Sequence, residues 1–309
     1  VSGNRHVGLA TQADPDKAWL KLAYDAYQRS TTYFDSNYRK GWEDSMNMFR
    51  SKHPQDSKYR SDAYKYRSRI FRPKSRSAER KHEATAALAL FSSPDVVSIS
   101  PVNEDDPNQA AASAVIKELL QYRLRKSIPW FLTSLGAFQD AMTVGVCASF
   151  QYWMYKTEQK QVTKTAMTPE GIPVQFEAAE TSVLVDKPCI ELFPIENIRF
   201  DPAAKWNDVV GSSPYLILQM PMYLRDVLEM MEVEDHSGKK WRTLDKQVIL
   251  SARITEDNAL KAARDGDRQD PQKESSELNE FDTVMVHLNF VKVWTQTFTY
   301  YTLKDTHML

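Results

Sequence analysis

The chain is poor in the residues on which disulfide-stapled, zinc-binding and nucleotide-binding folds depend. Cysteine occurs only twice, at Cys147 and Cys189, which is too few for a stapled secreted domain and provides no four-ligand zinc spacing. We therefore expect a reducing compartment. Glycine occurs only nine times, and neither a GxGxxG nor a GxxxxGK(S/T) pattern is present, which argues against a phosphate-cradling loop.

Long apolar runs and a strong net charge are also missing. No window approaches 18 consecutive apolar residues, so we expect no transmembrane helix and no membrane partner. A formal net charge of -1 excludes a globally basic nucleic-acid binder and a globally acidic mimic. The chain has 42% hydrophobic and 11% aromatic residues over 309 positions, which indicates a folded protein with one large domain or two.

Catalytic motifs are absent as well. The six histidines are scattered, without HxH or HExxH spacing, and no GxSxG sequence occurs. We interpret His287, in an alternating apolar segment, as a structural histidine, and we expect apolar surroundings to raise the pKa of Cys147. The sequence thus predicts no catalytic, cofactor or metal residues and a non-enzymatic protein. An alternative hypothesis is a hydrolase or nuclease with dispersed carboxylate ligands, because such ligands need not be close in sequence.

Hydrophobic periodicity predicts an α+β fold that begins with long helices. A helix should run from Pro15 toward residue 50, with an interruption near Gly41. Helices are also predicted over Ser57–Ile70 and Ser75–Phe91, separated by Arg72-Pro73. Two more should begin at Asp106-Pro107 and at Pro129, the second ending near Gly145.

From Val146 onward the period changes to that of strands, mostly antiparallel. We expect strands over 146–154, 161–167, 173–177, 182–193 and 214–220, a turn at Pro169-Glu170-Gly171, and short helices over Tyr223–Met231 and Asp245–Arg253. The predicted parts are a helical part (1–145), a β-rich part with short helices (146–254), a polar mobile loop (255–281) and a long strand or hairpin (282–309).

The most unusual feature is a local excess of positive charge. Twelve Lys or Arg residues lie between Arg50 and Lys81, against Asp56, Asp62 and Glu79. The candidate site residues in this basic stretch are Lys65, Arg67, Arg69, Arg72, Lys74, Arg76, Arg80 and Lys81. The aromatic residues among them allow two interpretations. In the first, the cations contact the phosphates of a nucleic acid while the rings stack on its bases. In the second, the arginines form a solvated surface or an interface between subunits.

On the interface interpretation, Tyr66, Ile70 and Phe71 are expected to be core anchors. The acidic run at Glu229, Glu232, Glu234 and Asp235 would then supply carboxylate partners from a neighbouring copy.

Three stretches together resemble one family. They are RSRIFRPKSRSAERKHEA (Arg67–Ala84), FQDAMTVGVCASFQYWMYK (Phe138–Lys156) and ELFPIENIRFDPAAKWND (Glu191–Asp208). In this order and spacing they resemble the portal proteins, or head-to-tail connectors, of tailed bacteriophages, especially the short-tailed podovirus type.

The resemblance implies a non-enzymatic virion subunit, made in the host cytoplasm, that forms a ring of twelve at one capsid vertex. Such a ring contacts the capsid protein, the terminase motor and tail adaptor proteins, and double-stranded DNA passes through it without sequence readout. The resemblance further implies that the chain forms a wing and is truncated before the stem and clip. Asp201-Pro202 would be a turn and Trp206 a packing anchor. The alternative is a nucleic-acid-binding protein that uses Arg50–Lys81.

Overall fold

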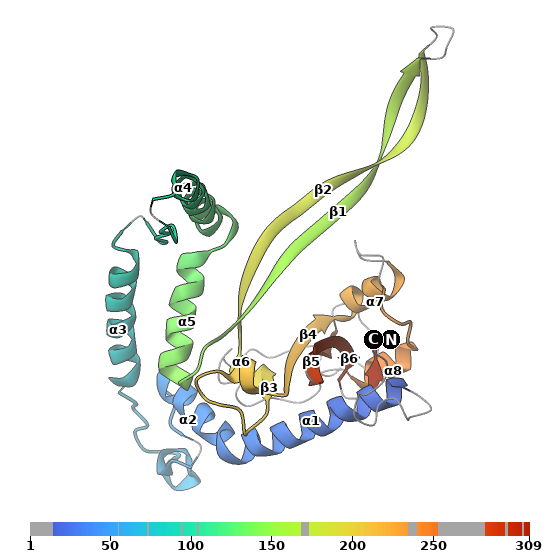
Figure 1. The fold of residues 1–309 in the computed structure, drawn as a ribbon. Coiled ribbons are helices and arrows are strands. Elements are labelled where there is room, and N and C mark those ends of the chain that lie inside the picture. The colour runs from blue at the N-terminus through green and yellow to red at the C-terminus, as the bar shows by residue number, and fades with distance from the viewer. Residues whose placement is uncertain are drawn as a thin grey trace.

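The fold is α+β, as predicted: helices make up most of the first half, and two antiparallel sheets follow (Figure 1). The computed structural model describes residues 15–54, 56–72, 74–93, 95–103, 105–167, 173–233, 240–252, 282–293, 296–304 and 306–309. The loop expected over 255–281 and the turn expected at Pro169–Gly171 lie outside these ranges.

The N-terminal helix is interrupted at Tyr38, close to Gly41. Helix α1 spans Pro15–Asn37 and helix α2 spans Arg39–Phe49. Tyr38 leaves the helical conformation (φ -121°) while its ring stacks on Trp42, with centroids 5.7 Å apart. The interruption expected near Gly41 is therefore present, three residues earlier in the chain.

The helix predicted over Ser57–Ile70 does not form. The segment has two single-turn 3-10 helices, η1 (Lys58–Arg60) and η2 (Asp62–Tyr64), and then runs without regular structure to Arg72. Ser57 and Ser61 both adopt extended backbone angles and end any continuous helix. Tyr66 and Ile70 are 94% and 83% exposed, so the expectation that they anchor a core was also wrong. Without an apolar face to bury, the periodic pattern has nothing to stabilise it.

Three further helices form a separate layer, close to the predicted bounds. They are α3 (Lys74–Phe91), α4 (Pro107–Tyr122) followed by the π-helical turn η3 (Arg123–Ser127), and α5 (Trp130–Val144). The carboxylate of Asp106 accepts a hydrogen bond from the Asn108 amide at 2.9 Å and caps α4. Gly145, with φ +87°, ends α5 in the left-handed conformation that favours glycine.

The separate strands predicted between 146 and 193 join into one long antiparallel hairpin, β1 (Ala148–Met167) and β2 (Pro173–Phe193). Its strands have 20 and 21 residues and extend about 65 Å, and Figure 1 shows the hairpin projecting from the body of the molecule. The root packs on α5, where Gly136 leaves room for Leu192; a Cβ at that position would lie 2.8 Å from Leu192 Cδ1.

The body of the molecule is built on a second, five-stranded antiparallel sheet. Its order is β3 (Ile198–Phe200), β4 (Tyr215–Tyr223), β5 (Thr283–Val293), β6 (Gln296–Leu303) and β7 (His307–Met308). The short helices are η4 (Ile195–Asn197), α6 (Val209–Ser212), α7 (Leu224–Glu232) and α8 (Lys246–Ser251). The strand-or-hairpin alternative for the C-terminal part is thus resolved as the hairpin β5–β6.

Each face of this sheet is covered by different helices. Helix α1 buries Ala26 against Ile217 and Val291, while α7 and α8 pack on the other face around Val286. None of the helices in the described ranges has the length and hydropathy of a membrane span.

Candidate interaction surface

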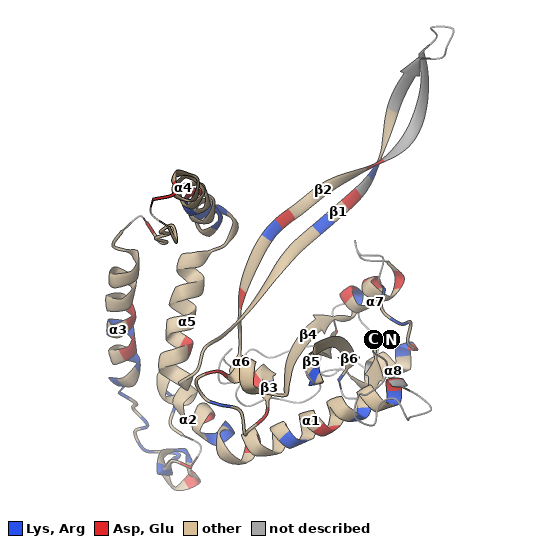
Figure 2. Cartoon of the chain, viewed as in Figure 1, with Lys and Arg blue, Asp and Glu red and all other residues tan. Residues whose placement is uncertain are grey.

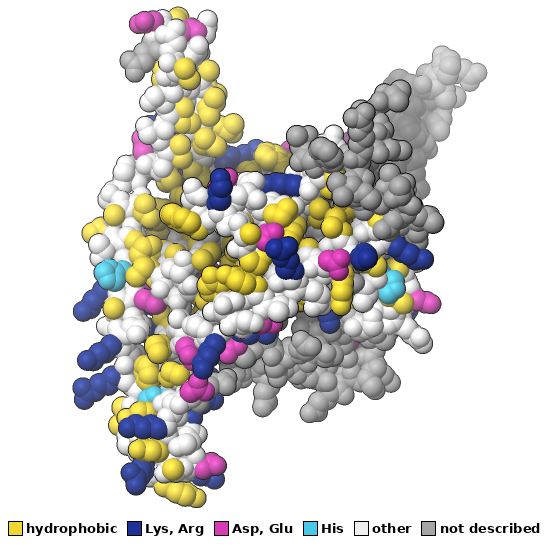
Figure 3. Space-filling view, turned by 60° about the horizontal axis from the view of Figure 1, so that its bottom comes forward, with side chains coloured by type: hydrophobic (Ala, Val, Ile, Leu, Met, Phe, Trp, Pro, Cys, Tyr) yellow, Lys and Arg dark blue, Asp and Glu magenta, His cyan; other side chains and the backbone are white. Residues whose placement is uncertain are grey.

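The basic stretch lies along one edge of the molecule (Figures 2 and 3). Lys65, Arg67, Arg69 and Arg72 belong to the irregular segment before α3, and Lys74, Arg76, Arg80 and Lys81 belong to the first half of α3. All eight residues are exposed. The structure therefore brings them to one edge, although they do not share a single helical face.

A cluster of rings holds the irregular segment in place. His53 stacks on Tyr59 at 4.6 Å and contacts Phe71 at 5.0 Å, and Tyr59 lies 5.6 Å from Tyr64 (all centroid distances). Arg67 lies over the Tyr64 ring at 5.3 Å, a favourable cation–π distance. These aromatic side chains contact one another, so their first role is to fix the backbone that carries the cations.

Two of the candidate arginines turn toward the body. The guanidinium groups of Arg76 and Arg80 lie 5.8 and 5.7 Å from the centroid of the Phe49 ring on α2. Arg80 also forms an ion pair with the buried Glu83, with Nη1 and Oε2 2.5 Å apart. Both side chains therefore join α2 to α3 within the chain.

Four of the remaining cations face outward, whereas Arg69 Nε donates to the Tyr64 carbonyl at 3.2 Å. Within the described ranges, the side chains of Lys65, Arg72, Lys74 and Lys81 form no ion pair. On α3, Lys74 and Lys81 flank a shallow hollow that is also lined by Ser77, Ala78, His82 and Thr85. These four side chains keep their charge available to an external partner.

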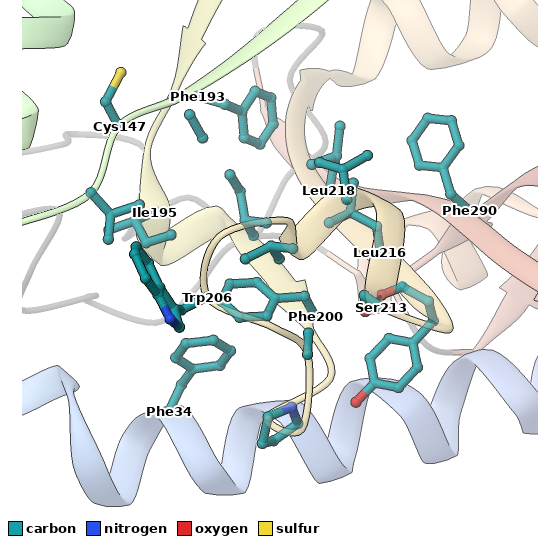
Figure 4. Close-up of a pocket in the computed structure, with 18 of the residues that line it drawn as sticks. Phe34, Cys147, Phe193, Ile195, Phe200, Trp206, Ser213, Leu216, Leu218 and Phe290 are labelled. Carbon is teal, nitrogen blue, oxygen red and sulfur yellow. Dashed lines mark hydrogen bonds between the residues drawn. The ribbon is translucent and has the colours of Figure 1, made fainter.

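A second feature, not predicted from the sequence, is an apolar cavity of about 1070 Å³ at the root of the hairpin. We call it the groove. Figure 4 shows side chains from α1, β2, η4, β3, β4 and β5 converging on it: Phe34, Phe193, Ile195, Phe200, Leu216, Leu218 and Phe290. These residues come from distant parts of the chain, so no local pattern could have indicated the groove.

Trp206 lies at the groove (Figure 4) but is 92% exposed, so the expectation of a packing anchor was wrong. Polar contacts hold its loop instead. The Asp201 carboxylate accepts from the Ala203 amide at 3.0 Å, and the Asp208 carboxylate accepts from the Gly211 amide at 2.7 Å. The expected turn at Asp201-Pro202 is confirmed, and the indole is left free at the mouth of the groove.

Tyr215, on β4, also lines the groove and has an unusual hydroxyl. Its side-chain oxygen is buried and makes no hydrogen bond to any described residue. Burial, with a smaller contribution from the negative charge of Asp201, raises the pKa of Tyr215 to about 12. The hydroxyl therefore keeps its proton at physiological pH.

His287 is a structural histidine, as expected. It is 1% exposed, its ring centroid lies 4.9 Å from that of Tyr27, and its Nε2 lies 3.3 Å from Gln219 Nε2. Burial lowers its pKa to about 3, and the positive charges of Arg199 and Lys304 contribute. Burial also raises the pKa of the Cys147 thiol, in the expected direction.

Metal binding finds no support in the described part of the chain, where no group of three or more His, Cys, Asp or Glu side chains could hold an ion. A scan against models of known protein families and a search of curated proteins both find no match. The function therefore has to be argued from the residues and their geometry.

Proposed function

We propose that the chain is a non-enzymatic, ring-forming portal subunit of a tailed bacteriophage. In this role twelve copies, the number in the family that it resembles, surround the opening at one capsid vertex. Double-stranded DNA enters and leaves through the ring, which contacts the capsid protein, the packaging motor and tail adaptors. The three sequence stretches quoted above suggest the family, and the form of the chain supports an assembly.

The observation that carries the proposal is the number of large apolar side chains left in water on projecting elements. Leu88 and Leu90 on α3, Val115 and Leu119 on α4, and Leu132 on α5 are all more than half exposed. Isolated exposed apolar residues are ordinary, but gathered patches mark interaction surfaces. A subunit that meets neighbours on several sides accounts for such a distribution.

The basic edge suits either contact that a ring subunit needs. Exposed lysines and arginines attract phosphates without reading sequence, which permits DNA to slide. The same side chains can pair with carboxylates of a neighbouring copy, and Glu229 and Glu232 on α7 are exposed. Glu234 and Asp235, the other two predicted partners, lie outside the described residues. The proposal includes both contacts.

A second candidate, a nucleic-acid-binding protein without a ring, is favoured by one observation. Tyr66 presents an almost fully exposed ring between Lys65 and Arg67, an arrangement suited to stacking on a base beside phosphates. A stable monomer that binds DNA tightly at low salt, and releases it as salt rises, would support this candidate.

Negative-stain electron microscopy of the purified protein tests the proposal. Closed rings with a central opening wide enough for duplex DNA are the expected result. Monomeric particles that bind duplex DNA in parallel binding experiments would contradict the portal assignment and favour the second candidate.

A further inference from the structure

Helix α4 has its polar side turned toward the rest of the chain and its apolar side turned toward solvent. Lys117 Nζ lies 2.8 Å from Asp95 Oδ2, and Gln121 Nε2 donates to Asp95 Oδ1 at 2.9 Å. With 3.6 residues per turn, Ser113, Lys117 and Gln121 share this inner face. They are also less exposed than the residues around them. This is the reverse of the usual amphipathic arrangement.

The outer face of α4 carries the large apolar residues. Their exposed fractions range from 40% for Leu120 to 68% for Val115. Val115, Leu119 and Tyr122 lie opposite the inner face, and Ile116 and Leu120 extend the apolar surface along the flank of the helix. Val115, Leu119 and Tyr122 have the i, i+4, i+7 spacing of helices that bind in grooves.

The size of this face is sufficient for a protein contact. A half-exposed aliphatic side chain contributes roughly 50 Å² and the tyrosine roughly 100 Å², so the face presents on the order of 300 Å² of apolar surface. That is the size of the largest apolar patch on a typical monomer. One side of a standard interface buries about 800 Å², of which roughly 450 Å² is apolar, so the face could supply roughly two thirds of that apolar area.

The groove is the matching apolar surface, but α4 cannot reach it within the same chain. Helix α5 separates α4 from the groove (Figure 1). The start of α5 follows α4 through η3, whereas Val144, in the last turn of α5, lines the groove. With 15 residues, α5 is about 22 Å long. The groove has an aromatic and aliphatic lining, a volume of about 1070 Å³ and an exposed mouth at Trp206 and Val210.

We propose that the outer face of α4 packs into the groove of a second copy of this chain. The contact joins two different surfaces, so it is head-to-tail, and a head-to-tail contact whose rotation closes produces a ring. The inference rests on the proposed function and assigns the surfaces through which the ring assembles. Tyr215, whose buried hydroxyl makes no hydrogen bond to any described residue, is among the residues that line the groove.

Disulfide trapping tests the contact directly, because the groove already contains a thiol. Cys147 is exposed and lines the groove. In the full chain, Cys189→Ser removes the other cysteine. Leu119→Cys then places one thiol on α4. On mild oxidation, this variant is expected to give a ladder of covalent oligomers on a non-reducing gel. Two controls should abolish the ladder: Cys147→Ser added to Leu119→Cys, and Ser113→Cys on the inner face in place of Leu119→Cys.

A charge variant provides an independent measurement. Leu119→Asp places a carboxylate in the contact and is expected to raise its dissociation constant about 100-fold or more, measured by sedimentation. Ala110→Asp, with the same charge on the inner side of the same helix, should assemble normally. Circular dichroism of both variants checks that the subunit remains folded.

The outcomes separate this inference from the proposed function. Rings that form without a disulfide ladder and tolerate Leu119→Asp would overturn the α4–groove contact and leave the portal proposal standing. A wild-type protein that remains monomeric, together with a Leu119→Cys variant that gives no ladder, would overturn both the α4–groove contact and the portal proposal.

Discussion

At the residue scale, His287 links burial to the pH dependence of folding. Its folded-state pKa of about 3 lies below the ordinary value of 6.5. Between these values the unfolded chain binds a proton that the folded chain does not. The stabilisation is therefore complete above pH 6.5 and is lost as the pH falls toward 3, by up to about 1.4 kcal/mol per pH unit.

Urea unfolding at several values between pH 5 and pH 7 measures this effect. The wild-type free energy of unfolding should fall with decreasing pH more steeply than that of His287→Gln, which does not titrate. Equal slopes for the two proteins would contradict the assignment of a buried, neutral His287.

Tyr215, which is buried, and Tyr300, which is partly buried, differ in the hydrogen bonding of their hydroxyls. The hydroxyl of Tyr215 makes no hydrogen bond to a described residue, whereas that of Tyr300 donates to the Trp19 carbonyl at 3.3 Å. Tyr215→Phe should therefore leave the free energy of unfolding unchanged or raise it by up to about 1 kcal/mol, and Tyr300→Phe should lower it by about 1 kcal/mol. Urea unfolding of the two variants checks this difference, and equal losses would contradict it.

At the scale of single elements, two glycines should respond oppositely to alanine. Gly145 ends α5 with φ +87°, a conformation that strains any residue with a Cβ, so Gly145→Ala should destabilise the protein by about 1 kcal/mol. Gly41 lies inside α2 with open space around it, so Gly41→Ala should stabilise by up to about 1 kcal/mol. Thermal unfolding of both variants measures the sign, and a stabilising Gly145→Ala would contradict the cap.

The helices that the sequence predicted well have local boundary signals. Asp106-Pro107 starts α4 and Gly145 ends α5, and these signals act within a few residues. The segment 57–70 failed because its pattern has no partner surface, which only the tertiary structure reveals. The joining of β1 and β2 into one ribbon, with a register shift between Lys156 and Thr157, likewise depends on cross-strand pairing rather than on either strand alone.

The candidate site was predictable only in part. The sequence indicated the basic stretch, and its eight residues do lie along one edge. It could not indicate that Arg76 and Arg80 pack on Phe49, because that contact depends on how α2 meets α3. The apolar spacing on α4 was visible, but the sequence does not say whether such a face turns inward or outward.

The irregular basic segment has its own test. Replacing Arg67, Arg69 and Arg72 together by Glu should impair ring assembly. The circular dichroism spectrum should change little, because this segment contains no long helix or strand whose loss would alter it. Replacing the same three by Lys keeps the charge and should preserve assembly. Normal rings with weakened DNA retention in the Glu variant would instead assign the segment to DNA.

At the scale of the whole molecule, the chain consists of a packed sheet domain with a helical layer and a long hairpin extending from it (Figure 1). Isolated two-stranded hairpins are marginally stable in water, and an outward apolar helix is unfavourable there. Neighbouring copies would stabilise both features, and this supports the proposed assembly.

The most direct test of the central claim is the native mass of the full-length protein in solution. The proposal predicts one dominant species at an integer multiple of the subunit mass, near twelve, that persists on dilution. A single monomeric mass over the same concentration range would contradict a self-assembling portal ring.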